Sequence, residues 1–168
     1  MVRWLGILLV LAASSCLGFL KAAELRRRPR LLKAMSDSLK LMRSDIAFRL
    51  LPLPDTFRHA AQAASGPLRE TYTTLAEQMC SETQPFSAQW RAVFSALDGF
   101  SPEDQAALCT LGEQLGKYDA DAQLDAIDYC IHYLQTAEED ARANAAQRGK
   151  LYSGLGLTAG MIVAVTLY

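Results

Sequence analysis

Residues 30–50 read RLLKAMSDSLKLMRSDIAFRL, and the apolar side chains in this stretch recur at intervals of three and four residues. That spacing places them on one face of an α-helix, and burial of this apolar face against other elements stabilises the helix. The stretch therefore predicts an amphipathic helix that begins near Glu24 or Pro29 and ends before Pro52, because proline breaks a helix interior. Its predicted buried residues are Leu32, Met35, Leu39, Met42, Ile46 and Leu50.

The remainder of the middle of the chain predicts five more helices, separated by proline and glycine. No stretch shows the alternation of apolar and polar residues that is typical of a strand. The fold class is therefore all-α, an antiparallel bundle of about six helices. The further helices are predicted from Pro54 to Gly66, over 67–80, from Pro85 to Gly99, from the Ser101-Pro102 cap, and from Asp119 or Asp121 through Gly149.

Uncharged apolar segments lie at both ends of the chain, over residues 4–20 and 151–168. As helices, each would measure about 26–27 Å, close to the hydrocarbon thickness of about 30 Å. We expect an N-terminal anchor over 1–23, the bundle over 24–150, and a second transmembrane segment over 151–168. The second segment is the more polar one, so a buried hairpin or an interfacial helix remains an alternative. Gly156 and Gly160 form a G-x-x-x-G spacing that lets membrane helices approach closely.

Basic residues flank the bundle side of both apolar segments, and the positive-inside rule then places the bundle in the cytoplasm. The predicted location is the cell membrane. The alternative is an exported or lipid-anchored helical binding protein, because Ala13-Ser14-Ser15-Cys16 loosely resembles a cleavage or lipidation site. Positive charges directly after the first segment oppose export. The membrane-flanking residues are Lys21, Arg26, Arg27, Arg28, Arg30 and Lys150.

Acidic residues dominate the second half of the bundle, with eleven acids and one base from Asp98 to Asp140. Such a distribution is unlike that of a nucleic-acid-binding protein, which gathers Lys and Arg for phosphate contacts. The acidic residues form either a solvated face or a docking face for a basic protein partner. The candidate docking residues are Asp121, Asp125, Asp128, Glu138 and Glu139.

No catalytic constellation is present in the sequence, so no enzyme activity, cofactor or metal is predicted. The two histidines, His59 and His132, have no companion ligands at metal spacing, and no phosphate-binding loop occurs. Asp128 and His132 predict a local contact along one helix. Trp90 is expected in the core. The cysteines lack paired spacing and are expected to be reduced, buried fillers; they are Cys16, Cys80, Cys109 and Cys130.

A repeated Leu-Gly pattern stands out near the end of the fifth predicted helix. A glycine inside a helix costs up to about 1 kcal/mol relative to alanine, so two glycines four residues apart need a reason. Helix termination followed by an N-cap is one explanation, and a packing or partner-contact site is the other. The pattern comprises Leu111, Gly112, Leu115, Gly116, Asp119 and Gln123.

Taken with other short motifs, this pattern resembles the stage III sporulation protein AB family of endospore-forming bacteria. The matching motifs include Arg28-Pro29, Pro52-Leu53-Pro54, Trp90 and Lys150-Leu151-Tyr152. The short, polar final segment departs from the family pattern. The resemblance implies a non-enzymatic component of the complex between mother cell and forespore, seated in the mother-cell membrane. The resemblance also implies that the bundle is like the six-helix cytoplasmic domains of the platform proteins of type II secretion and type IV pilus machines. Its expected partners are a cytoplasmic ATPase, other subunits and, as an open possibility, further copies of itself.

Overall fold

The computed structural model describes residues 20, 23–80, 84–115 and 120–166, with the side chains of residues 120 and 150–166 left out. The chain forms two compact units. The first comprises Met1–Pro29 and Glu139–Tyr168, and the second is Arg30–Glu138, which we call the helical domain. Everything described below belongs to the helical domain unless another unit is named.

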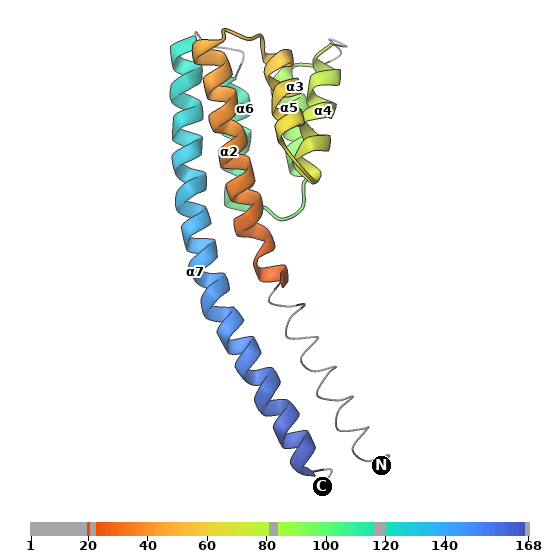
Figure 1. Cartoon of the computed structure of the whole chain (residues 1–168). Coiled ribbons are helices and arrows are strands. Elements are labelled where there is room, and N and C mark those ends of the chain that lie inside the picture. The colour runs from red at the N-terminus through yellow and green to blue at the C-terminus, as the bar shows by residue number, and fades with distance from the viewer. Residues whose placement is uncertain (1–19, 21–22, 81–83, 116–119, 167–168) are drawn as a thin grey trace. The chain divides into compact units, whose positions relative to one another are not determined.

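All regular elements in the described residues are helices, which confirms the predicted fold class. Six are present in the order in which the sequence predicts them (Figure 1). They are α2 (Arg27–Phe48), α3 (Leu53–Ala63), α4 (Pro67–Met79), α5 (Phe86–Ser95), α6 (Pro102–Gln114) and α7 (Ala120–Thr166). As predicted, α7 continues through Gly149 without a break.

Proline and capping residues set the starts of the short helices. Pro54, Pro67 and Pro102 each stand in a first turn, where a missing backbone N–H is tolerated. Ser101 caps α6 through a capping box, in which its hydroxyl accepts from the Asp104 amide and its own amide donates to the Asp104 carboxylate. Gly66 has φ of 61°, a conformation that suits glycine between two helices.

The core of the helical domain is built from the predicted stripe of α2 and an aromatic cluster. The α2 residues from Leu32 to Ile46 that the stripe predicts are all buried. Trp90 is fully buried, as predicted, with its ring centroid 4.3 Å from that of Phe94 and 5.9 Å from that of Phe57. The cluster joins α3, α4 and α5 into one hydrophobic layer; its members are Phe57, Tyr72, Phe86, Trp90 and Phe94.

The stripe prediction was wrong at its last position, Leu50. Helix α2 ends at Phe48, and Leu50 is 79 % exposed with φ of 52°. Two local causes favour this early end. Residues before a proline disfavour helical dihedrals, and the Asp45 carbonyl accepts the amides of both Arg49 and Leu51, which closes a turn there.

No helix in the described part of the chain is both long and apolar enough to cross a membrane. The predicted N-terminal span lies almost entirely outside the described residues, as does Lys21. The side chains of 150–168 also lie outside them, which includes Lys150 and the positions of Gly156 and Gly160. Both spans therefore stay predictions.

Candidate functional site

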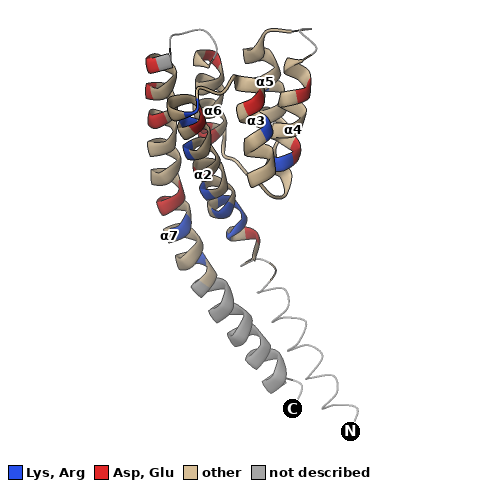
Figure 2. Ribbon diagram, turned by 45° about the horizontal axis from the view of Figure 1, so that its top comes forward, with Lys and Arg blue, Asp and Glu red and all other residues tan. Residues whose placement is uncertain are grey.

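Two exposed carboxylates, Asp121 and Asp125, lie near the start of α7. The ribbon in Figure 2 is coloured by residue type and shows acidic positions along this part of α7 and basic positions along the neighbouring α2. Asp128 is a different case, because Arg43 of α2 binds its carboxylate with Nε 2.5 Å from Oδ1. This hydrogen bond, together with the charge of Asp128, raises the pKa of the Arg43 guanidinium. The contact of Asp128 is thus with α2, and not with His132 as the sequence predicted.

The predicted acidic face is divided by the boundary between the two units. Glu138 is half-buried at the end of the helical domain, and Glu139 is exposed and belongs to the other unit. The exposed carboxylates that the structure brings together in the helical domain are therefore Asp121 and Asp125.

A groove between α6 and α7 lies directly beside these carboxylates. Its volume is about 410 Å³, and small side chains of both helices form much of its wall. Asp125 of the acidic face and Leu111 of the Leu-Gly pattern both line it, two features that no spacing in the sequence connects. Tyr129 lines the same groove and is 72 % exposed.

Within the Leu-Gly pattern, Gly112 allows α6 to approach α5. A Cβ atom at this position would lie 2.2 Å from Cδ1 of Trp90, far inside any real contact distance. The Trp90 ring is also fixed by its Nε1–H, which donates to the Leu108 carbonyl at 2.7 Å. Leu111 and Leu115 are buried, and Gln123 is half-buried near the start of α7. Gly116 and Asp119 lie outside the described residues.

A buried carboxylate, that of Asp45, with partners on α3 and just after α2, was missed by the sequence analysis. Asp45 is 1 % exposed, its Oδ2 lies 2.6 Å from Nδ1 of His59, and its Oδ1 lies 3.3 Å from Nη1 of Arg49. Fourteen residues separate Asp45 from His59, so no local spacing could pair them. One feature of the sequence could have indicated this buried acid: Asp45 lies next to Ile46, on the buried side of the apolar stripe.

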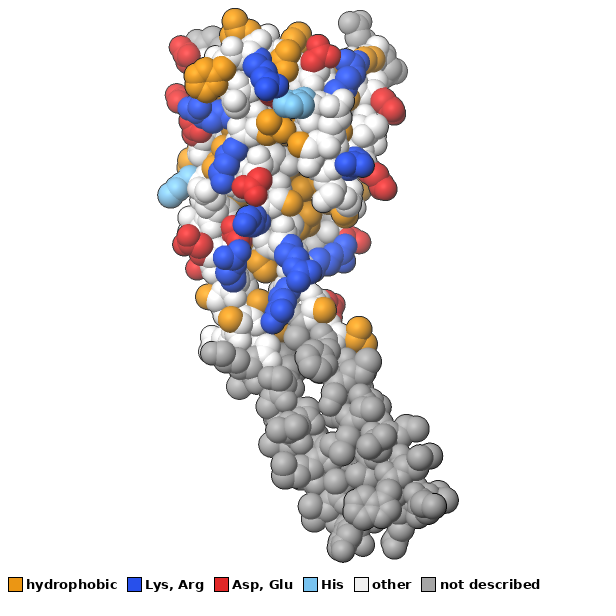
Figure 3. Space-filling view, in the orientation of Figure 1, with side chains coloured by type: hydrophobic (Ala, Val, Ile, Leu, Met, Phe, Trp, Pro, Cys, Tyr) orange, Lys and Arg blue, Asp and Glu red, His pale blue; other side chains and the backbone are white. Residues whose placement is uncertain are grey.

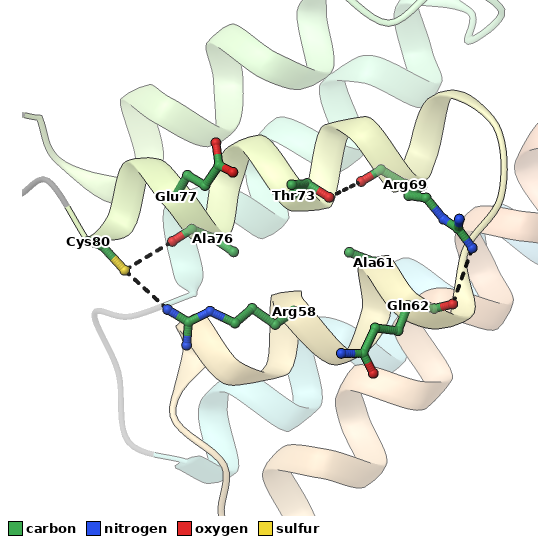
Figure 4. A pocket seen from close by; sticks show the side chains of 8 residues that line it. All are labelled: Arg58, Ala61, Gln62, Arg69, Thr73, Ala76, Glu77 and Cys80. Carbon is green, nitrogen blue, oxygen red and sulfur yellow. Dashed lines mark hydrogen bonds between the residues drawn. The ribbon is translucent and has the colours of Figure 1, made fainter.

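A second groove, between α3 and α4, has a volume of about 720 Å³. Figure 4 shows Arg58 and Cys80 at one end, Arg69 and Gln62 at the other, with alanine side chains between them. Cys80 is exposed, so its prediction as a buried filler was wrong, whereas Cys130 is buried as predicted. The exposed thiol follows from its place directly after the end of α4.

In the parts of the chain that are described, no three His, Cys, Asp or Glu side chains are grouped so that they could hold a metal ion. The predicted absence of enzyme activity and of cofactors remains a prediction.

Comparison with known proteins gives the family. Residues 3–168 match the family described as Stage III sporulation protein AB. The chain belongs to the stage III sporulation protein AB family. Stage III sporulation protein AB of Bacillus subtilis (strain 168) is 23% identical over 171 residues, which cover 99% of each chain. This family membership confirms the resemblance and implies a role in sporulation.

A solved structure of a Stage III sporulation protein AB has the same fold. The TM-score is 0.65 at 20% identity, and the match covers 71% of this chain and 97% of the solved one. At this identity the likeness concerns the fold alone. The stage III sporulation protein AB family is not a known family of enzymes.

Proposed function

We propose that this protein is a membrane-anchored assembly platform of a transenvelope, secretion-like complex needed for endospore formation. Its proposed location is the mother-cell membrane, with the helical domain in the cytoplasm. The proposed partners are a cytoplasmic ATPase and other subunits of the complex. Family membership supports the sporulation role, and the domain's geometry supports the anchoring.

The geometry that carries the proposal is the antiparallel pairing of α2 and α7. The Arg43–Asp128 ion pair fixes their register, and Figure 1 shows the two helices side by side. Because α2 and α7 run in opposite directions, Arg30 and Glu138, where the chain enters and leaves the helical domain, lie at the same end of it. The predicted apolar segments continue beyond these two points, as a membrane hairpin requires.

The opposite end of the helical domain then faces away from the membrane. It carries Asp121 and Asp125 of α7, which are exposed. Two carboxylates at this end offer a docking surface to a soluble partner with Lys or Arg side chains, for which charge complementarity sets orientation and association rate. In Figure 3, Lys and Arg side chains are scattered over the visible face of the helical domain, and α2 contributes Arg30, Lys33 and Lys40 among exposed bases.

The test is binding of the purified cytoplasmic ATPase to the full chain in lipid nanodiscs. Reversal of both carboxylates, Asp121→Lys with Asp125→Lys, is expected to weaken binding at least tenfold. The matched control reverses two exposed acids elsewhere, Glu70→Lys with Asp98→Lys, and should leave affinity within twofold. Asp128 is unsuitable, since its reversal also breaks the ion pair with Arg43. Equal loss in both pairs of variants would contradict a specific acidic docking end.

Orientation is tested separately through Cys80, which the structure shows to be exposed. In intact cells, a membrane-impermeant maleimide is expected to leave Cys80 unlabelled, and permeabilisation should expose it. Cys80→Ser provides the background. Labelling in intact cells would support the exported or lipid-anchored alternative.

A further inference from the structure

The groove between α3 and α4 has no role in the proposed function, and its lining residues suit a ligand of another kind. Among the residues that the structure describes, its lining comes from α3, α4 and the residue that follows α4. A groove between two helices suits a segment of another protein better than a small molecule, which must bury most of its surface in a pocket.

The floor of this groove is apolar because both helices place alanine there. Ala61 of α3 and Ala76 of α4 face each other across it and are nearly buried (Figure 4). With methyl groups in place of longer side chains, the space between the helices stays open at about 720 Å³. A floor of this kind accepts an apolar side chain of a partner.

Each end of the groove carries a guanidinium group held in position by neighbouring atoms. At one end, Nη1 of Arg58 binds the Asp55 carboxylate, and Nη2 donates to Sγ of Cys80 at 3.3 Å. At the other end, Nε of Arg69 donates to the Ala64 carbonyl at 3.0 Å. These contacts leave further N–H donors on each group, since a guanidinium has five.

The groove offers guanidinium donors to carboxylates. Its lining contains two arginines and one acid, Glu77, whose carboxylate turns away from both guanidinium groups in Figure 4. Asp55, outside the lining, already pairs with Nη1 of Arg58, so a partner carboxylate there binds the donors that Asp55 leaves. Sulfur is a weak acceptor, so the Arg58 donor that now reaches Cys80 gains by exchange for a carboxylate oxygen. Planar guanidinium groups match carboxylates well.

We propose that the α3–α4 groove binds an acidic segment of a partner protein, with carboxylates on Arg58 and Arg69 and an apolar side chain on the alanine floor. The two guanidinium groups lie at opposite ends of the groove (Figure 4). A helix with two acids four residues apart presents both carboxylates on one face, and this is the occupant that the test uses. This surface is opposite in charge to the carboxylates of α7 and does not depend on their role.

Cys80 makes the test direct, because its thiol lies at one end of the groove. The probe is a helical peptide with an N-terminal cysteine, two glutamates four residues apart and leucine between them, and its counterpart carries glutamines instead. Each peptide is supplied as its mixed disulfide with mercaptoethanol and is equilibrated with the full chain in detergent under mercaptoethanol, so that exchange at the Cys80 thiol releases mercaptoethanol as the leaving group. The mixed disulfide at Cys80 is then measured by intact mass, with Cys80→Ser as the background. We expect at least fivefold more capture of the glutamate peptide than of the glutamine peptide.

The ratio between the two peptides cancels any change in the reactivity of the thiol itself. In Arg58→Gln with Arg69→Gln the ratio should fall to about one, whereas a matched pair of neutralised bases outside the groove, Lys40→Gln with Arg91→Gln, should retain it. A ratio of one in the unaltered chain, or equal loss in both pairs, would overturn the proposal. Loss of the preference in 10 mM inorganic phosphate at constant ionic strength would overturn it in favour of a small-anion site.

Discussion

Gly112 shows how one missing side chain can determine how two helices pack. Its Cα lies so close to Trp90 that an added methyl group would meet the indole at 2.2 Å. Because Trp90 is fully buried and its N–H is bound to Leu108, the ring cannot move aside without losing that bond. We expect Gly112→Ala to lower the free energy of unfolding by about 1–3 kcal/mol, measured by urea unfolding of the full chain in detergent with circular dichroism.

The matched control is Gly149→Ala, which replaces another glycine that lies in a helix. A Cβ atom there meets nothing within 4 Å. Alanine is the better helix former, so this substitution should leave the free energy of unfolding unchanged or raise it by up to about 1 kcal/mol. An unchanged or raised free energy of unfolding in Gly112→Ala, as in the control, would show that the approach to Trp90 does not restrict this position.

The backbone of Leu50 is strained, and its exposed side chain gains too little from burial to offset that cost. A bulky residue at φ of 52° costs on the order of 1 kcal/mol, and at 79 % exposure Leu50 gains little from burial. Asparagine tolerates this conformation, so Leu50→Asn is expected to raise the melting temperature by a few degrees. Phe48→Asn, equally exposed but at the end of α2, should not. A drop with Leu50→Asn would show that this leucine is held by contacts.

At the scale of elements, a helix end could be predicted from the sequence when neighbouring residues determine it. The start of α6 could be predicted, because its cap and proline are adjacent residues. The end of α2 could not, because the spacing of Ile46 and Leu50 continues the stripe, while the turn at Asp45 is closed by main-chain bonds. The two grooves were also beyond prediction, since each is a space between helices that the packing alone creates.

Asp104 links one element to another, and its two roles can be separated. It is fully buried, it completes the capping box of α6, and its Oδ1 lies 3.4 Å from the hydroxyl of Tyr133 on α7. Ser101→Ala removes one cap contact and should cost about 1 kcal/mol. Asp104→Ala removes a cap contact and also the contact with the half-buried Tyr133, so we expect about 2–3 kcal/mol. Equal costs in thermal unfolding would show that the contact with α7 contributes nothing.

At the scale of the whole molecule, the helical domain presents two surfaces of opposite chemistry. Asp121 and Asp125 extend from one end of α7, whereas Arg58 and Arg69 mark the groove between α3 and α4. If both act as the docking surfaces proposed above, like charges would exclude the wrong partner from each surface. Both surfaces belong to the same folded domain, so the stability of this domain would limit the conditions under which either could bind.

At alkaline pH, the buried thiol of Cys130 should lower the stability of the helical domain. Burial raises the pKa of the Cys130 thiol to about 12, while an unfolded cysteine ionises near 8.5. The folded state therefore holds its proton where the unfolded state has lost it, and stability falls as pH rises above about 8.5. The contribution of this thiol to the slope of the free energy of unfolding is expected to approach about 1.4 kcal/mol per pH unit by pH 10. Cys130→Ala should remove this contribution, and Cys80→Ala, at an exposed thiol, should keep it. A smaller slope near pH 10 remains in Cys130→Ala, because burial also raises the pKa of Tyr72. Identical slopes in all three chains between pH 8.5 and 10 would show that Cys130 is not the group responsible.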